Sequence, residues 1–360
     1  MFAEIVEGEL KEATVDDLNY SYVEGKGTAT VTGRANEELR NITIPGSVTI
    51  DGSNYSVKSV GAGAFQSCSI DTLVIQEGVE TIKKNAFKYN YYSLESVTLP
   101  SSLRTIGEEA FYYCYGFSNL VIPEGVTTIG SYAFYYCNGL QKLEIPSSLD
   151  SIGNNAFFKC NNLSSVVSRI QTPFEISENV FAIRDYYYDD SGNCHYIWED
   201  GFEFDKVKSS ATLYVPDGTK SSYESIAGWN MFANIIEGEL LEATVDSLTY
   251  SYLKGKGTAT LVGHTYSETR NIKIPGSVKI SDESYTVTEI GVSAFQGYNN
   301  LDTLVIESGV ELIGESAFSN DYNLRSVTFP TSLKTIGKNS FYDCRIDSLV
   351  VPEGVETIEE

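Results

Sequence analysis

A six-residue motif, Ile-Gly-x-x-Ala-Phe, recurs along this chain at a nearly fixed interval, and the interval restricts the fold more than any other feature. Intact copies occupy residues 106–111, 129–134 and 152–157, so their phenylalanines follow one another every 23 residues. Looser copies end at Phe65, Phe87, Phe295, Phe318 and Phe341. A constant period of this length is typical of a solenoid, in which each repeat buries its apolar face against its neighbour.

Each repeat also contains a short segment with the pattern of a half-buried strand. Leu143 and Ile145 alternate with charged residues, and Pro146 then ends the segment because proline has no amide hydrogen for a ladder. Gly153 is expected to turn the chain before the Ala-Phe pair forms a short helical or irregular turn. We predict the same strand at residues 73–75, 97–99, 120–122, 304–306, 327–329 and 349–351.

The complete repeat, residues 140–160, reads Leu-x-x-Leu-x-Ile-Pro-x-x-Leu-x-x-Ile-Gly-x-x-Ala-Phe-x-x-Cys. This form resembles the BspA-like leucine-rich repeat of bacteria, which is named for a surface protein of oral bacteria. The resemblance implies a β-rich repeat solenoid with little helix, a right-handed superhelix of ~23-residue coils with β-hairpin N-caps and a strand–helix C-cap. It also implies a secreted or cell-surface protein whose signal or anchor lies outside this chain.

Five cysteines share one position of the repeat, three residues after its phenylalanine: Cys68, Cys114, Cys137, Cys160 and Cys344. This placement favours a structural ladder of buried, reduced thiols that face loop carbonyls. Disulfides between neighbouring coils are the alternative, but parallel side chains suit the disulfide torsion poorly. The chain has no Cys-x-x-Cys pair and only two histidines, so we expect no metal site and no cofactor.

A second, longer repetition divides the chain into modules. Residues 231–240 closely repeat residues 1–10, and the match continues through 271–278. We therefore predict residues 1–9 as the tail of a preceding module, 10–235 as a first module and 236–360 as a truncated second module. Within them we expect a β cap at 10–59, coils at 60–181, an aromatic and acidic insertion at 182–212, a C-cap at 213–235, a second β cap at 240–289 and coils at 290–360. The first cap is predicted to contain a β-hairpin around Gly25-Lys26-Gly27.

Charge and residue pattern exclude several functions. Aspartate and glutamate number 49 against 25 lysines and arginines, a formal net charge of −24, which argues against nucleic acid or an anionic membrane as the partner. No apolar run approaches the length of a membrane span. The two histidines have no acid or nucleophile partner in the pattern, and paired acids such as Glu108-Glu109 are typical of a solvated turn. We therefore expect no enzymatic activity.

Two groups of aromatic residues are candidates for binding. The insertion contains Tyr186, Tyr187, Tyr188, Tyr196, Trp198 and Phe202, which could stack on sugars or anchor a protein, or could simply cover the end of the column of coils. The pairs Tyr112-Tyr113 and Tyr135-Tyr136, with Tyr342, are expected to stack into a stripe along the turn side. That stripe suits either packing or adhesion.

These features lead to one main hypothesis and two alternatives. The main hypothesis is a non-catalytic surface or secreted protein that mediates adhesion or protein–protein recognition through a solenoid face, with host or bacterial surface proteins as partners. The first alternative is a carbohydrate-binding accessory protein that uses the aromatic insertion at 186–205 to hold glycans. The second is a passive spacer at the cell surface.

Overall fold

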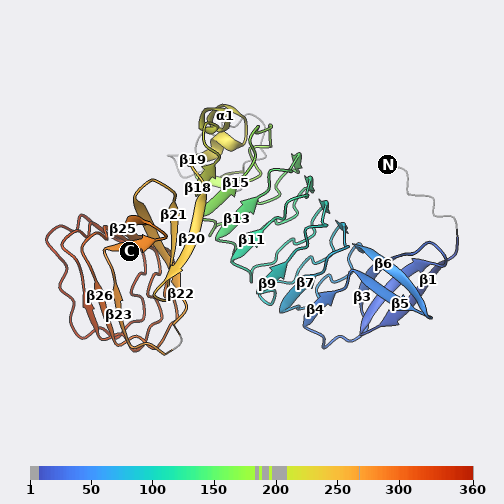
Figure 1. The fold of residues 1–360 in the computed structure, drawn as a ribbon, viewed down its shortest axis with the longest axis horizontal. Helices are drawn as coiled ribbons and strands as arrows, with labels where there is room; N and C mark the ends of the chain where they lie inside the picture. The colour runs from blue at the N-terminus through green and yellow to red at the C-terminus, as the bar shows by residue number, and fades with distance from the viewer. Residues whose placement is uncertain (1–7, 183–185, 189–193, 197–208, 267, 360) are drawn as a thin grey trace. The chain divides into compact units, whose positions relative to one another are not determined.

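The computed structural model describes residues 8–182, 186–188, 194–196, 209–266 and 268–359. The chain divides into two compact units, residues 1–237 and 238–360, each built of stacked coils (Figure 1). Helix is nearly absent from the described residues, which contain only α1 (Lys220–Ser225) and a 3-10 turn at Trp229–Met231. No helix in this part of the chain is long and apolar enough to cross a membrane. The predicted β-rich repeat solenoid is therefore confirmed.

In the first unit, the predicted strands of successive coils pair in parallel and in register. One series begins with a three-stranded sheet of β4 (Asn41–Ile44), β7 (Thr72–Ile75) and β9 (Ser96–Thr98). It resumes in a sheet that starts with β11 (Asn119–Val121), β13 (Lys142–Ile145) and β15 (Ser165–Ser168), as Figure 1 shows. A second series contains two-residue strands: β8 (Thr81–Ile82), β10 (Thr105–Ile106), β12 (Thr128–Ile129) and β14 (Ser151–Ile152).

The N-terminal cap is an extension of this second series. β2 (Leu18–Val23) and β3 (Thr28–Arg34) form the predicted hairpin. An unpredicted strand, β1 (Leu10–Val15), pairs with β2, and the intervening Asp16 and Asp17 make the turn with φ of 48° and 63°. Strand β3 then pairs with β6 (Ser53–Val60), which also carries β5 (Ser47–Ile50) and leads directly to β8. The cap therefore covers the first coil by continuing its sheet.

The C-terminal cap contains one strand more than the sequence indicated. The predicted strand is β18 (Ser209–Val215), and the predicted short helix is α1. After the helix the chain returns as β19 (Phe232–Glu237), which pairs in parallel with β18, so β18 is not the last strand of the sheet. Trp229 lies between helix and strand, fully buried, and its indole donates to the carbonyl of Phe174 at 2.9 Å.

The second unit repeats the arrangement of the first. Its strands are β20 (Leu240–Val245), β21 (Leu248–Leu253), β22 (Thr258–His264), β23 (Asn271–Ile274), β24 (Ser277–Ile280), β25 (Glu283–Ile290), β26 (Thr303–Ile306), β27 (Leu312–Ile313), β28 (Ser326–Thr328), β29 (Thr335–Ile336) and β30 (Thr357–Ile358). The strand predicted at 349–351 was wrong. Only an isolated bridge forms there, between Ser326 and Ser348, and Leu349 and Val351, the counterparts of buried Leu120 and Ile122, are 41% and 40% exposed.

The repeat phenylalanines form a stacked column through each unit. From Phe65 to Phe181 adjacent ring centroids lie 5.1–5.4 Å apart, with interplanar angles of 3–15°. Phe295, Phe318 and Phe341 continue the same pattern in the second unit, at 5.2 and 5.3 Å. Phe181, in a degenerate copy of the motif, ends the first column against Trp229 and Phe232.

The motif glycine has a role different from the one expected. Gly153 and its counterparts do not have the positive φ of a glycine turn. A Cβ at Gly130 or Gly153 would instead lie 2.5 or 2.3 Å from a backbone nitrogen of the preceding coil. The glycine is therefore needed because two backbones approach closely, and each such approach closes a hydrogen bond, as from Gly130 N to Ile106 O at 2.8 Å.

Gly130→Ala is expected to separate two coils and to lower the free energy of unfolding by about 1–3 kcal/mol, since neither backbone can move without breaking its ladder. Urea unfolding followed by circular dichroism measures the loss. Ser131→Ala, at the adjacent and partly exposed position, is the control. An alanine at 130 that unfolds at the same urea concentration as the control would contradict the close-approach explanation.

Candidate recognition surface on the turn side of the coils

The turns that follow the repeat phenylalanines are part of the hydrogen-bonded framework. In each turn a backbone amide donates to a carbonyl of the next coil, as from Tyr89 to Tyr112, Tyr113 to Tyr135 and Tyr136 to Phe158, at 2.8–2.9 Å. These bonds fix the position of each turn relative to its neighbour. Side chains carried by the turns are therefore held at a regular spacing.

In the first unit these turns carry a continuous group of aromatic rings, which we call the tyrosine surface. It consists of Tyr89, Tyr91, Tyr92, Tyr112, Tyr113, Tyr115, Tyr132, Tyr135, Tyr136 and Phe158. Tyr112 stacks on Tyr135 with centroids 4.8 Å apart and planes 7° from parallel, and Tyr113 stacks on Tyr136 at 4.7 Å and 12°. The stripe predicted from these two pairs is confirmed, and it extends further than the sequence indicated. Tyr342, which was predicted to join it, stacks on no described ring.

The extension lies on a second loop of the coil. Tyr92 packs against Tyr115 with centroids 4.9 Å apart, and Tyr115 lies 5.6 Å from Tyr136. Sequence reasoning missed these residues because it followed only the positions next to the repeat phenylalanine. The signal was present, since Tyr115 follows Tyr92 by the 23 residues of one repeat.

Two lysines contact the tyrosine surface. The ammonium of Lys88 lies 4.3 Å from the ring centroid of Tyr112 and forms an ion pair with Glu109 at 2.5 Å. The ammonium of Lys159 lies 5.4 Å from the ring centroid of Tyr136. Cations are attracted to the electron-rich faces of tyrosine rings. These contacts further restrict the side chains of the surface.

Three tyrosines at the centre of the surface, Tyr112, Tyr113 and Tyr115, remain neutral at physiological pH. Burial raises the pKa of Tyr112, Tyr113 and Tyr115, and neighbouring phenols raise it further. Each hydroxyl therefore keeps its proton and can both donate and accept a hydrogen bond. At the edge of the surface, Tyr91 and Tyr92 are 47% and 80% exposed. The surface thus offers rigid apolar rings with polar rims.

Four of these tyrosines have an unfavourable backbone conformation: Tyr132, with φ of 58°, and the three that lie two residues after a repeat phenylalanine. Tyr89, Tyr113 and Tyr136 have φ of 63°, 61° and 60°, in the left-handed region. This conformation costs about 1 kcal/mol for a residue with a Cβ and suits glycine or asparagine better. In the second unit the same position carries Gly297, Asn320 and Asp343. Stability of the turn therefore does not explain why the first unit has tyrosine there.

The cysteine position of the repeat lies beneath these turns. Cys114, Cys137, Cys160 and Cys344 each direct a thiol at the carbonyl of the preceding coil's repeat phenylalanine, with Sγ–O distances of 3.1–3.3 Å. The five cysteines with described side chains are all free. Burial raises the pKa of the Cys114 and Cys160 thiols to about 12. They are therefore protonated donors.

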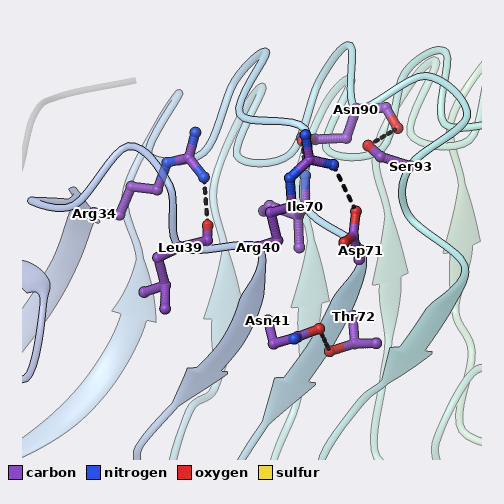
Figure 2. A network of polar contacts seen from close by, with 9 residues as sticks. All are labelled: Arg34, Leu39, Arg40, Asn41, Ile70, Asp71, Thr72, Asn90 and Ser93. Atoms are coloured by element: carbon purple, nitrogen blue, oxygen red, sulfur yellow. Dashed lines mark hydrogen bonds and ion pairs between the residues drawn. The ribbon is translucent and has the colours of Figure 1, made fainter.

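Asn90 occupies the cysteine position in one coil of the first unit and makes equivalent contacts. Its amide nitrogen donates to the carbonyls of Phe65 and Phe87, both at 2.8 Å, and its oxygen accepts from the amide of Ile70 at 3.1 Å. Figure 2 shows Asn90 beside Ile70 and Ser93. The position therefore requires a hydrogen-bond donor that faces carbonyl oxygens.

The residues proposed from the aromatic insertion cannot be compared with this surface. Trp198 and Phe202 lie outside the described residues, and for Tyr186–Tyr188 and Tyr196 only the backbone is described. That backbone forms β16 (Tyr186–Tyr188) and β17 (Cys194–Tyr196), which pair antiparallel. A binding role of the insertion stays a prediction.

Comparison with protein families finds a match over more than half of the chain. The description of the matching family is BspA type leucine rich repeat region, with six copies over residues 58–187 and 264–360. The comparison with curated protein sequences found no match.

Several solved structures are similar to this chain. A leucine-rich repeat protein of T. pallidum is 26% identical, with 48% of this chain and 78% of that chain covered and a TM-score of 0.43. A leucine-rich cell surface protein of Faecalibacterium prausnitzii is 20% identical over 98% of this chain and 86% of its own, with a TM-score of 0.38. The pneumococcal vaccine antigen PcpA is 18% identical over 97% and 78%, with a TM-score of 0.40.

The buried thiols give a direct chemical test of the carbonyl-facing position. In the native chain at about pH 8, Cys114, Cys137 and Cys160 are expected to resist iodoacetamide, because alkylation needs an accessible thiolate. Half-buried Cys68 and Cys344 should react before the three buried thiols. Peptide mass spectrometry before and after denaturation measures the modification. Rapid native labelling of Cys137, or a disulfide-linked Cys114–Cys137 peptide pair, would show that the thiols are not arranged as described.

Proposed function

This chain belongs to the BspA-type leucine-rich repeat family, and from that membership we propose that it is a non-catalytic recognition protein, secreted or displayed on the bacterial cell surface. Its partner in this proposal is a protein of a host or of another bacterium. The observation that carries the proposal is the tyrosine surface of the first unit.

Tyrosine suits a protein-binding surface for physical reasons. It provides a large contact area but has only two side-chain torsions to restrict on binding, and its hydroxyl can form hydrogen bonds at the rim. In this chain the rings already contact one another, so most of the entropic cost of ordering them is met when the unit folds. The unfavourable φ of Tyr89, Tyr113 and Tyr136 further supports selection for a surface rather than for turn stability.

The ring arrangement favours a protein over a sugar as the partner. A sugar is bound by aromatic side chains mainly through an open ring face. Here the faces of Tyr112 and Tyr113 are stacked on the rings of the next coil. Edges and hydroxyls are left for a ligand, and Tyr92 is the most exposed ring. An array of ring edges and hydroxyls that extends over several coils fits a protein surface.

The rest of the first unit offers less to a partner. Outward residues of the long-strand sheet include Val74, Thr98 and Val121, which are short and β-branched, as expected for sheet stability. The second unit has Tyr298, Tyr322 and Tyr342 on its turns but no stacked tyrosine pair among its described residues. The two units therefore do not present two copies of one site, and avidity between them is not part of the proposal.

Replacing the exposed end of the tyrosine surface is expected to abolish binding while the fold is kept. The variant Tyr91→Ser/Tyr92→Ser/Tyr115→Ser removes three partly or largely exposed rings, none of which belongs to the phenylalanine column. Purified protein is applied to arrays of extracellular-matrix proteins and of glycans. We expect the parent to bind a matrix protein and the variant to lose at least about tenfold in affinity, or 1.4 kcal/mol.

A matched control changes exposed tyrosines that lie elsewhere. Tyr322→Ser/Tyr342→Ser alters two rings of the second unit, which are 42% and 62% exposed, and should leave binding unchanged. If both variants lost affinity equally, the tyrosine surface would not be the binding site. Binding confined to glycans would support the carbohydrate alternative, and no binding on either array would favour a spacer.

A further inference from the structure

The two units are built alike, so positions at which they differ in chemistry are informative. The polar contacts at the start of the coils are the same in both. Arg40 pairs with Asp71 at 3.2 Å in the first unit, as shown in Figure 2, and Arg270 pairs with Asp302 at 3.2 Å in the second. Against this background, several neutral or cationic residues of the first unit correspond to titratable ones in the second, among them Asn90 to Asp321, Ser59 to Glu289 and Arg34 to His264.

The first of these differences places an acid where the fold requires a donor. Asp321 follows Phe318 by three residues, as Asn90 follows Phe87, so it occupies the carbonyl-facing position. Asp321 is fully buried, and neither carboxyl oxygen has a hydrogen-bond partner among the described residues. A carboxylate can only accept hydrogen bonds, whereas the protonated acid can donate one.

Burial opposes the negative charge of Asp321 more strongly than its surroundings stabilise that charge. The backbone amides of Leu301 and Asn323 face the carboxyl and lower its pKa, but burial raises the pKa by more, and Asp302 adds a second negative charge nearby. Cys344, from the next coil, donates its thiol to the Phe318 carbonyl at 3.1 Å and so is not a partner. No cation forms an ion pair with Asp321 in the described part of the chain. An unpaired buried charge is strongly unfavourable.

We infer that the second unit, unlike the first, is held together more tightly in mildly acidic than in neutral solution, because Asp321 must take up a proton to make a hydrogen bond that Asn90 makes without one. The unit therefore carries a proton-dependent contact in the middle of its column of coils. Acidification strengthens this part of the chain while the first unit, with its tyrosine surface, is unaffected at the equivalent position.

The direction of the effect follows from the protonation equilibrium. Burial raises the pKa of Asp321 from 3.8 to about 6 in the folded chain. A raised pKa means that its contribution to stability is fully present below about pH 4 and is lost as the pH rises through about 6. Burial also raises the pKa of Glu289, which acts in the same direction.

His264 acts in the opposite direction. Its ring stacks on Phe295 with centroids 4.7 Å apart, at the start of the second column, and burial lowers its pKa. Its contribution is present at neutral pH and is lost as the pH falls through the lowered value. A test must therefore isolate the contribution of Asp321. Comparing proteins that differ only at position 321 does so, because all of them retain His264 and Glu289.

Hydrogen exchange of the full chain, read by mass spectrometry and corrected for the intrinsic pH dependence of exchange, isolates this contact. Amide protection is compared at about pH 7 and about pH 5 in the parent and in Asp321→Asn. The pKa of Asp321 is 3.8 before burial and about 6 in the folded chain. From these two values, lowering the pH from about 7 to about 5 should raise the protection of peptides spanning residues 301–344 about tenfold more in the parent than in the variant. At neutral pH, Asp321→Asn should be better protected than the parent.

The reciprocal variant is a control within the same chain. Asn90→Asp should weaken protection of residues 70–114 at neutral pH and restore part of it at about pH 5. Equal pH responses of the parent and Asp321→Asn in residues 301–344 would overturn the inference. So would an acid-induced gain of the same size in the first unit of the parent, since that would show a response unrelated to Asp321.

Discussion

The register between neighbouring coils is the constraint on which the other features of this protein depend. Each coil forms backbone hydrogen bonds with its neighbour at both strand series and again at the turn, and the motif glycine allows the two backbones to approach. The phenylalanine rings then stack at 5.1–5.4 Å because the backbone has already set that spacing. An isolated coil of this length could bury no core, so the stack is cooperative between neighbours.

The same register determines how side chains outside the core behave. A residue type that recurs at one position of the repeat becomes a ladder, whether it is a buried thiol or an exposed phenol. In the first unit this produces the tyrosine surface, with Tyr112 on Tyr135 and Tyr113 on Tyr136. In the second unit most of the same positions carry small or polar residues, and the buried position beneath them holds Asp321. We therefore propose that one scaffold supports a recognition surface in one unit and a proton-dependent contact in the other.

Much of the fold was predictable because the same residue pattern recurs in every repeat of the sequence. The strands other than the one predicted at 349–351, the hairpin at Gly25 and Gly27, and the short helix of the C-cap follow from local pattern and were confirmed. Strand β19 was missed because it pairs with β18 across the intervening helix, and sequence does not show such pairings. The candidate surface was predicted only in part. Tyr92 and Tyr115 meet on a loop whose geometry depends on the stack.

The central claim is that the tyrosine surface is a fixed part of the hydrogen-bonded framework, and residue-resolved amide exchange measured by NMR tests it most directly. The amides of Tyr89, Tyr113 and Tyr136 donate to the next coil at 2.8–2.9 Å. We expect them to exchange as slowly as the strand amides of Leu120 and Leu143. If these three amides exchanged at the rate of an unstructured peptide, the account would be contradicted, because the tyrosine rings would then be attached to mobile loops.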